Sequence, residues 1–315
     1  MTMAFAFDIG LVALLLAVAT WCIAARQAFT AVVAFVIYGF LMAIVWVELS
    51  AVDVALTEAA IGSGLTGTLL LGAAARLRRA ETLSAAKRPS RILRLVAALL
   101  SATVAAALAA AVLSLHDPAP TLAPAAAANA AATGLSNPVT NVLMAFRAMD
   151  TMLEKVVLLI ALVGVWSLTP NHLWGGRPGP RYPSDTYGAL AFLARLLAPI
   201  GVIVGIYVFW AGASRPGGAF QGGTLLAAMW LLVMRAGLAD LPPINRRWLR
   251  LLLIAGPAVF LMVGLAGLWL GDAFLAYPVA YAKPIIVAIE VPMALTVAVT
   301  LVLLMAGVPE RSADR

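Results

Sequence analysis

Nine long apolar stretches, each able to form a helix that crosses a lipid bilayer, determine what this chain can fold into. About 20 residues of α-helix span the hydrocarbon core of a bilayer. The stretches lie near residues 5–25, 28–48, 54–75, 92–115, 149–169, 187–212, 219–237, 248–271 and 283–307. Hydrophobic residues make up 63% of the sequence and charged residues 11%, against about 45–50% and 25% in soluble proteins. We therefore expect an all-α, polytopic integral membrane protein with about nine transmembrane helices.

The positions of the Lys and Arg residues predict the orientation of these helices. If the N-terminus lies outside, 16 of the 21 Lys and Arg residues fall on the cytoplasmic side, as the positive-inside rule requires. These are Arg26, Arg76, Arg78, Arg79, Lys87, Arg88, Arg91, Arg94, Arg177, Arg181, Arg235, Arg246, Arg247, Arg250, Arg311 and Arg315. The C-terminus is then cytoplasmic. This bias accounts for the net charge of +7, so we expect the lipid bilayer and no nucleic acid as a partner.

The scarcity of metal ligands argues against redox chemistry in this chain. The sequence holds one cysteine, Cys22, and two separated histidines, His116 and His172. These are too few for a zinc, haem or iron–sulfur site made by this chain alone. We expect no cofactor, and we do not expect an enzyme.

Composition divides the chain into units. Residues 1–115 form one helical group with four spans. Residues 116–137 are rich in Ala and Pro and lack the bulky side chains that build a packed unit, so we expect a periplasmic linker. Residues 138–170 supply one span. A loop with four prolines and three glycines follows, before a four-span unit at residues 187–308.

The first informative charges are Glu48, Asp53 and Glu58. Glu48 and Asp53 fit the turn between the second and third spans, where water would solvate them. Glu58 lies five residues beyond Asp53, about 7.5 Å deeper along a helix. The small and hydroxyl residues at 62–68 allow close helix packing, but packing does not explain a carboxyl group beside them. We therefore expect Glu58 to act in proton or cation movement.

The second group is Arg147, Asp150, Glu154 and Lys155. The apolar run after them, residues 156–168, is too short to cross a bilayer, so the helix must extend backward through these charges. Steps of three and four residues place Arg147, Asp150 and Glu154 on one helix face. They fit either an ion-paired polar stripe in the membrane or a solvated turn at its surface.

The third group is Lys283 and Glu290, two helical turns apart in a helix that contains Pro284 and Pro292. Pro292 has no N–H for the carbonyl of Ala288, so a free carbonyl is expected near Glu290. Carboxylate and carbonyl oxygens suit a cation, and an acid within a membrane can also relay protons. Lys283 fits a side chain that reaches the outer interface.

A glycine-rich segment, SRPGGAFQGG at residues 214–223, joins the sixth and seventh spans. It is not a phosphate-binding loop, because no strand precedes it and no Lys-Ser or Lys-Thr follows. On physical grounds alone it fits a tight turn between antiparallel helices.

Three segments together resemble components of Mrp-type multisubunit cation/proton antiporters. Residues 52–62 (VDVALTEAAIG) resemble the MbhD-like part of the large subunit of these complexes, and residues 137–154 (NPVTNVLMAFRAMDTMLE) resemble the MbhE-like part that follows it. Residues 187–307, with the segment at 214–223, are similar to the smaller subunit called MnhB or MbhF. The family pattern reads SPGGGFQGG, so this chain departs from it at Arg215 and Ala219.

The resemblance implies a fused accessory subunit of a complex that exchanges Na+ for H+ across the inner (plasma) membrane of a bacterium. It implies as partners an antiporter-like large subunit, because the fourteen-span portion of the family's large subunit is absent from this sequence, and several small membrane subunits. It also assigns Asp53, Glu58, Arg147, Asp150 and Glu154 to acidic or paired positions of an ion path. With Lys155, Lys283 and Glu290 from the arguments above, these are our predicted ion-path residues. The alternatives are an ion-translocating membrane subunit of a hydrogenase or complex I-like enzyme and a purely structural subunit.

Overall fold

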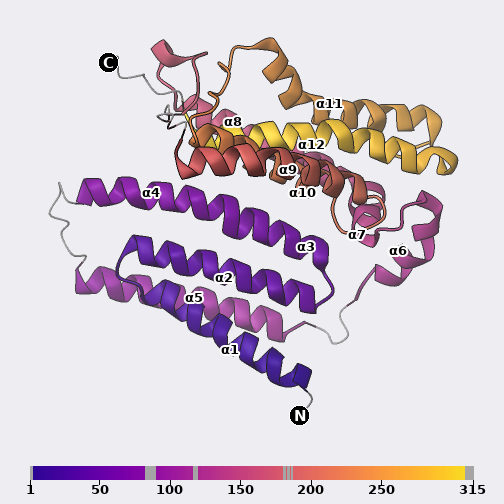
Figure 1. The fold of residues 1–315 in the computed structure, drawn as a ribbon. Coiled ribbons are helices and arrows are strands. Elements are labelled where there is room, and N and C mark those ends of the chain that lie inside the picture. The colour runs from indigo at the N-terminus through magenta and orange to yellow at the C-terminus, as the bar shows by residue number, and fades with distance from the viewer. Residues whose placement is uncertain are drawn as a thin grey trace.

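The computed structural model describes residues 3–81, 90–115, 120–179, 182, 185 and 187–308, and these residues are built from helices (Figure 1). The long helices are α1 (Met3–Ala24), α2 (Ala28–Glu48), α4 (Thr66–Glu81), α5 (Arg91–Leu113), α8 (Ala148–Ser167), α9 (Ala189–Ala211), α10 (Ala219–Arg235), α11 (Arg247–Leu270) and α12 (Ala282–Ala306). The short elements are α3 (Val52–Thr57), the π-helices η1 (Glu58–Leu65) and η3 (Val142–Phe146), α6 (Ala123–Asn129), η2 (Ala130–Thr133), α7 (Pro138–Asn141), η4 (Asn171–Leu173) and η5 (Val279–Tyr281). The expected all-α fold is confirmed.

Seven helices within the described residues are long and apolar enough to cross a membrane. They are Phe5–Ala24, Ala28–Glu48, Val52–Ala75, Arg91–Leu113, Ala189–Ala211, Arg247–Leu270 and Val279–Ala306. The other two expected spans are also helical. One is α10, which is apolar but only 17 residues long, and the other is α8, whose first two turns carry three charges. The chain is a polytopic membrane protein.

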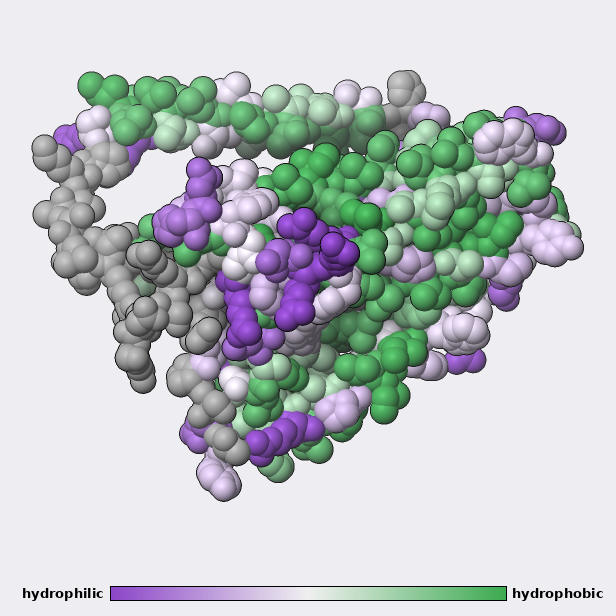
Figure 2. All heavy atoms as spheres, turned by 90° about the horizontal axis from the view of Figure 1, so that it is seen from above, coloured by the Kyte–Doolittle hydropathy of each residue, from purple (hydrophilic) through white to green (hydrophobic). Residues whose placement is uncertain are grey.

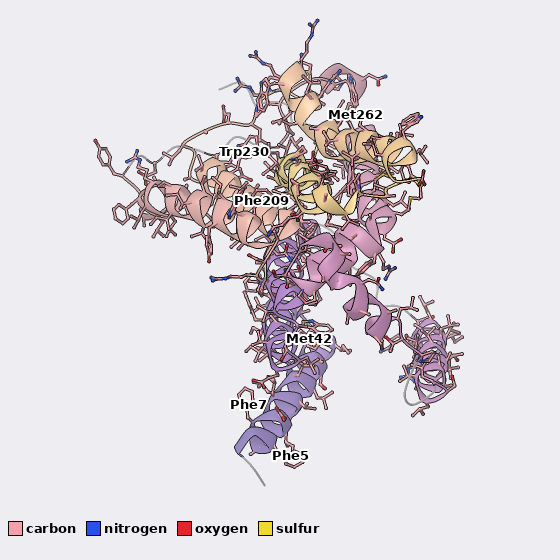
Figure 3. All side chains as sticks on the ribbon, turned by 90° about the vertical axis from the view of Figure 1, so that its right-hand side faces the viewer. Phe5, Phe7, Met42, Phe209, Trp230 and Met262 are labelled. Atoms are coloured by element: carbon pink, nitrogen blue, oxygen red, sulfur yellow. The ribbon has the colours of Figure 1, made fainter. Side chains whose placement is uncertain are left out.

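The first helical group packs around α2. Helix α2 contacts α1 on one side and the continuous rod of α3, η1 and α4 on the other. Small residues bring these helices together: Ala34 is fully buried, and a Cβ on Gly67 would lie 2.5 Å from the Val36 side chain. This group occupies the lower half of Figure 1, and the exposed Phe5 and Phe7 mark its far end in Figure 3.

The second group surrounds α12. In the most apolar stretch of this helix, 67% of the residues are buried. Helices α8, α10 and α11 pack against α12, and α9 packs against α10. Figure 3 shows Phe209 of α9 and Trp230 of α10 beside α12, and Met262 on the outer side of α11. The centre of the second group is therefore a helix that is apolar on nearly every face, as expected for a helix enclosed by others.

A side-chain hydroxyl of α12 forms hydrogen bonds with backbone groups of α11 that lie next to a proline. Pro257 cannot donate a backbone hydrogen bond, which disturbs the helix around it. The buried Thr296 hydroxyl donates to the carbonyl of Leu252 (2.7 Å) and accepts from the N–H of Gly256 (2.9 Å). It thus bridges two backbone groups that an undisturbed helix would join directly, and it fixes α11 against α12.

Helix α5 lies apart from both groups. None of its residues is buried, although it is one of the most apolar helices. The space-filling view shows it as a separate bar along the upper edge, and the side view shows it away from α1 (Figures 2 and 3). Its Ser90 caps the first turn by accepting from the N–H of Leu93.

The described part of the segment expected to be a periplasmic linker, residues 120–137, contains helical and buried residues. Residues 123–133 form α6 and η2, and the side chains of Leu135 and Asn137 are buried. The small size of the Ala-rich residues did not predict this packing. A short Ala-rich run is a good helix former, and the bulky Leu135 reaches the core shared with Phe260 and Ile286.

Candidate functional site

A cavity of about 220 Å³ with both apolar and charged side chains in its wall lies where α3, α7, η3, α8, the start of α10 and α12 meet. It is lined by Thr57, Val139, Thr140, Leu143, Met144, Thr151, Glu154, Lys155, Gly217, Gly218, Ala219, Phe220, Gln221, Glu290 and Met293. We call it the central cavity. It brings together Glu154 and Lys155 of the second charged group, Glu290 of the third, and residues of the glycine-rich segment. Its volume exceeds the ~30 Å³ that one water molecule occupies.

Lys155 is the buried cation of the central cavity. Its side chain is 3% exposed, and its Nζ lies 2.8 Å from Oε1 of Glu154, which is 49% exposed. The same ammonium group lies 4.6 Å from the centre of the Phe220 ring, within the range of a cation–π interaction. Lys155 is therefore neutralised by a neighbour on its own helix and held by the face of an aromatic ring on α10.

Glu290 is the buried carboxyl group of the central cavity. It is 4% exposed on α12, and its backbone donor is the N–H of Ala219, the first residue of α10. The positive end of the α10 dipole therefore faces the carboxylate. Among the side chains that the structure describes, no Lys or Arg forms an ion pair with Glu290.

Asp53 lies buried beside the central cavity and holds the glycine-rich segment in place. Its Oδ1 accepts from the backbone N–H of Gly217 (2.8 Å) and from Nδ2 of Asn137 (3.5 Å). Its exposure is 5%, so the expectation of a water-filled turn was wrong for this residue. The sequence could not show this, because Gly217 comes from a loop 164 residues away.

The glycine-rich segment is bonded to the residues that lead into α8. The Thr140 hydroxyl donates to the carbonyl of Gly212 (2.7 Å), and Asn137 Nδ2 donates to the carbonyl of Arg215 (2.9 Å). The backbone N–H of Ser136 donates to the carbonyl of Ala213 (3.1 Å). The segment does connect α9 to α10 as a turn, but it is also the point where three distant parts of the chain meet.

Two glycines make this turn possible. Gly217 and Gly218 have φ angles of 144° and 128°, which residues with a Cβ rarely adopt. A Cβ on Gly217 would also collide with the backbone carbonyl of Val208. These glycines allow the loop backbone to approach Asp53 and the cavity closely.

Glu58 lies outside the central cavity, on the face of η1 that contacts α2. A Cβ on Gly62 would collide with its carboxylate, and a Cβ on Gly39 of α2 would lie 3.4 Å from its Oε1. The buried hydroxyl of Ser63 has no hydrogen-bond partner nearby. Glu58 thus occupies a space that two glycines leave between helices, in a π-helical segment of the kind found frequently at functional sites.

Three predicted residues lie on the surface of the described structure. Arg147 and Asp150 form an ion pair with a 2.6 Å Nε–Oδ2 distance, and their side chains are 68% and 53% exposed. Arg147 has φ −128° and ψ 36°, which separates η3 from α8. Glu154 therefore pairs with Lys155 and not with Arg147. Lys283 is exposed, seven residues before Glu290, and no ion pair joins the two.

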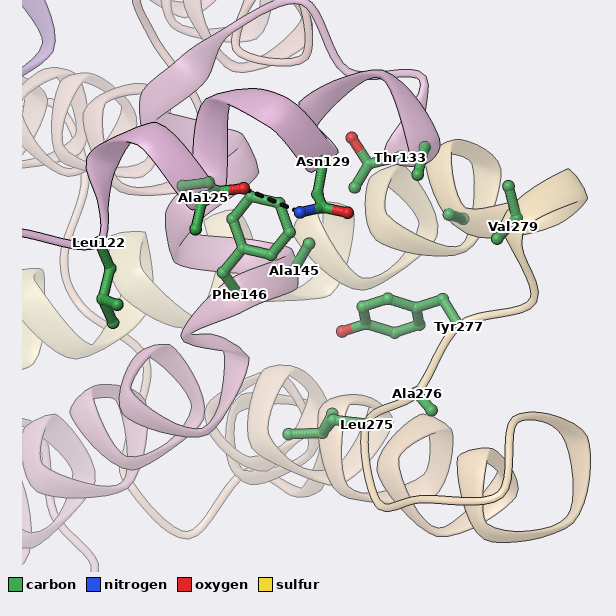
Figure 4. Close-up of a pocket in the computed structure, with 13 residues that line it drawn as sticks. Leu122, Ala125, Asn129, Thr133, Ala145, Phe146, Leu275, Ala276, Tyr277 and Val279 are labelled. Atoms are coloured by element: carbon green, nitrogen blue, oxygen red, sulfur yellow. Dashed lines mark hydrogen bonds between the residues drawn. The ribbon is translucent and has the colours of Figure 1, made fainter.

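A larger hollow of about 590 Å³ lies near α6 and the turn before α12 (Figure 4). Its walls are mostly Ala, Leu and Phe side chains, with Asn129, Thr133 and Tyr277 as polar residues. The amide of Asn129 donates to Ala125, and the buried Tyr277 hydroxyl has no partner. Burial raises the pKa of Tyr277 to about 12, so this residue stays neutral at physiological pH. The hollow holds no charged group, which separates it from the central cavity.

Sequence reasoning missed several residues of the site. Gln221 and Thr57 carry no charge and Phe220 is an ordinary apolar residue, so the chemistry of these side chains does not by itself point to a site. Gln221 Nε2 donates to the Asp53 carbonyl (3.3 Å) and to the Thr57 hydroxyl (3.2 Å). The available signal was the glycine-rich segment, which contains both Phe220 and Gln221. Among the described residues, no group of three or more His, Cys, Asp or Glu is placed to hold a metal ion.

Comparison with protein families identifies two parts of the chain. Residues 13–79 match the family MbhD, described as one of the subunits of MBH, and residues 189–308 match the domain related to the MnhB subunit of Na+/H+ antiporter. An uncharacterized protein of Methanocaldococcus jannaschii is 30% identical over 158 residues, which are 45% of this chain and 60% of that protein. The chain thus spans less than two thirds of this relative.

Two solved structures extend the likeness beyond these two parts of the chain. A chain of the Mrp complex from Dietzia sp. DQ12-45-1b is 26% identical with a TM-score of 0.70, and the match covers 97% of this chain and 35% of that one. A chain of the membrane-bound sulfane sulfur reductase, an archaeal respiratory membrane complex, is 24% identical with a TM-score of 0.54. This match covers 67% of this chain and 96% of that one, and it shows that the two chains share a fold. The chain is therefore a membrane protein that carries an MbhD domain and a domain related to the MnhB subunit of Na+/H+ antiporter in one polypeptide, and it is similar over most of its length to a chain of an Mrp complex.

Proposed function

We propose that this subunit provides part of the ion path of a complex that exchanges Na+ for H+, and that the path passes through the central cavity. The observation that carries the proposal is the presence of Glu154, Lys155 and Glu290 around one cavity in an otherwise apolar bundle. Charged groups within a membrane are costly, so they persist where they line a path or pair with one another.

The chemistry of the cavity suits exchange. A carboxylate binds either a proton or a cation, and one ligand excludes the other. Glu290 has no permanent cation as partner among the described side chains, so it is free to take either. The Lys155–Glu154 pair lies across the same cavity and can compensate for the change in charge when Glu290 loses its ligand.

The remaining predicted residues extend this path in our proposal. Asp53 orders the loop at one edge of the cavity, and Glu58 in η1 lies on the neighbouring helix rod, next to α2. Arg147, Asp150 and Lys283 are on the surface, where a partner subunit would contact them. The proposed partners are an antiporter-like large subunit and small membrane subunits. We keep the orientation with the N-terminus outside, in a bacterial inner membrane.

Sodium-dependent proton movement in vesicles that contain the intact complex tests the proposal. Lys155→Met and Glu154→Gln should abolish or strongly reduce this movement, because each removes a charge from the cavity. Arg177→Met and Asp240→Asn are matched controls. Arg177 and Asp240 form an ion pair of similar length, 2.9 Å, but both side chains are about half exposed and lie outside the cavity.

Co-purification of the other subunits must show that each variant complex assembles. Full exchange activity with Lys155→Met would remove the cavity from the ion path. The alternative of a respiratory complex is supported by the fold shared with the sulfane sulfur reductase. Identification of the co-purifying chains separates the two, since iron–sulfur or nickel–iron subunits would favour the respiratory alternative.

A further inference from the structure

Two side-chain oxygens from different helices face one point beside Gly218. A methyl group on the Cα of Gly218 would lie 3.4 Å from Oε1 of Glu290 and 3.5 Å from Oε1 of Gln221. Because residue 218 is glycine, no side chain occupies this point. We call the space between Gly218, Gln221 and Glu290 the Gly218 niche; all three residues line the central cavity.

Hydrogen bonds determine which end of the Gln221 amide faces the niche. Nε2 of Gln221 donates to the backbone carbonyl of Asp53 and to the hydroxyl of Thr57. The Asp53 carbonyl can only accept, and the Thr57 hydroxyl already donates to it (3.0 Å). The amide nitrogen must therefore face α3, and the amide oxygen is left to face Gly218 and Glu290.

With Glu290 ionised, the charged groups that line the central cavity add up to one uncompensated negative charge. The buried Asp53 carboxylate lies outside this lining and accepts from the N–H of Gly217 and from Nδ2 of Asn137. Lys155 is paired with Glu154, and Glu290 has no ion-pair partner among the described residues. The dipole of α10 stabilises the carboxylate but carries only about half of one charge. One monovalent cation at Glu290 would balance the groups that line the cavity.

We infer that the Gly218 niche is a binding site for a monovalent cation, with Oε1 of Glu290 and Oε1 of Gln221 as ligands. Hard cations prefer oxygen ligands, and both ligands here come from well-packed helices, α12 and α10. Glycine at position 218 provides the room for the ion. Thr57 and the Asp53 carbonyl are positioning groups, because they orient Gln221. The inference rests on the proposed function, and it specifies where in the central cavity the ion is held.

Chemical protection of Glu290 tests the site directly in the intact complex. Dicyclohexylcarbodiimide modifies carboxyl groups within membranes, and a cation bound to the carboxylate blocks the reaction. Mass spectrometry of the peptide containing Glu290 should show labelling in choline buffer and protection by Na+ or Li+. Gln221→Leu removes one ligand and should raise the Na+ concentration for half-protection about tenfold or more, the effect of losing about 1.4 kcal/mol of binding free energy.

The peptide containing Glu58 is the internal control, because its carboxylate lies outside the niche and Gln221→Leu should not change its labelling. The inference fails if Na+ does not protect Glu290 at concentrations that support exchange, or if Gln221→Leu leaves protection unchanged. If Glu290 is not labelled in any buffer, equilibrium binding of radioactive Na+ decides: Glu290→Gln should lose one bound ion per complex, and an unchanged isotherm would overturn the site.

These outcomes are separate from those of the proposed function. Suppose that the complex exchanges ions and that Lys155→Met abolishes this exchange, but that Na+ does not protect Glu290 from labelling. The proposed ion path is then supported, and the cation site in the Gly218 niche is refuted. If Na+ protects Glu290 in a complex that exchanges no ions, the cation site is supported and the proposed exchange of Na+ for H+ is refuted.

Discussion

Removal of the Asp53 carboxylate should release the loop that borders the central cavity. Asp53→Ala leaves the N–H of Gly217 without its acceptor in a buried position. A buried donor that loses its partner costs about 1–3 kcal/mol. Since about 1.4 kcal/mol corresponds to a factor of ten, the ratio of docked to released loop should fall roughly 5- to 140-fold. The side-chain amide of Asn137, which also donates to Asp53, keeps its hydrogen bond to the carbonyl of Arg215, so its loss of Asp53 adds no second unpaired donor.

Hydrogen–deuterium exchange of the intact complex measures this ratio, because local opening exposes the Gly217 amide to solvent. The peptide that contains Gly217 should exchange faster in Asp53→Ala by the factor given above. Asp53→Asn keeps an acceptor oxygen and should show a smaller increase. Asp150→Ala removes an exposed carboxylate from a surface pair and should leave this peptide unchanged. Unchanged exchange in an assembled Asp53→Ala complex would refute the view that Asp53 holds the loop.

Two further predictions concern helix packing. Thr296→Val should destabilise the complex by about 1–3 kcal/mol, because two hydrogen bonds to α11 are lost and each contributes about 0.6 to 1.7 kcal/mol in a membrane protein. Thr296→Ser keeps the hydroxyl, so its complex should have a higher melting temperature than that of Thr296→Val. The opposite order of melting temperatures would contradict the bridging role of the hydroxyl. Gly62→Ala should displace the Glu58 carboxylate and reduce exchange in vesicles, whereas Gly72→Ala, where a Cβ would meet nothing within 4 Å, should exchange at the wild-type rate. Equal rates for the two alanine variants would show that the position of Glu58 does not matter.

The positions of the helices could be predicted because each depends on local sequence. The expected span 28–48 coincides with α2, since an apolar run of bilayer length forms a helix wherever it lies. The helical position of Lys155 also follows from local reasoning: the apolar run after it is too short to cross, so the helix had to extend backward, and α8 begins at Ala148. The burial of Lys155 did not follow, because the sequence left a solvated turn equally open. Glu154, one residue away, is half exposed, which shows that helix phase decides which of two neighbouring charges is buried.

The partners of these charges could not be predicted, because they come from distant parts of the chain. The sequence placed Lys283 near Glu290 by helical spacing, but the two do not pair, and the nearest backbone donor to Glu290 is on α10. Similarly, Arg147 was expected to share a face with Glu154, yet the turn at Arg147 interrupts the helix. Spacing rules hold only while a helix is continuous, and both π-helical segments next to the cavity change that spacing.

The parts of the protein that line the central cavity belong to one polypeptide chain. The MbhD match ends at residue 79 and the MnhB match begins at residue 189. Glu154 and Lys155, which line the cavity, lie between these two matched parts. The residues before α8 also bond to the loop after α9, through Thr140 and Asn137. In separate polypeptides, these contacts would have to offset the entropy of association. In a single chain the same contacts form intramolecularly, at an effective concentration set by the connecting segments. The three parts that line the cavity are therefore kept at fixed stoichiometry, and the loop held by Asp53 always meets the helix that carries Lys155.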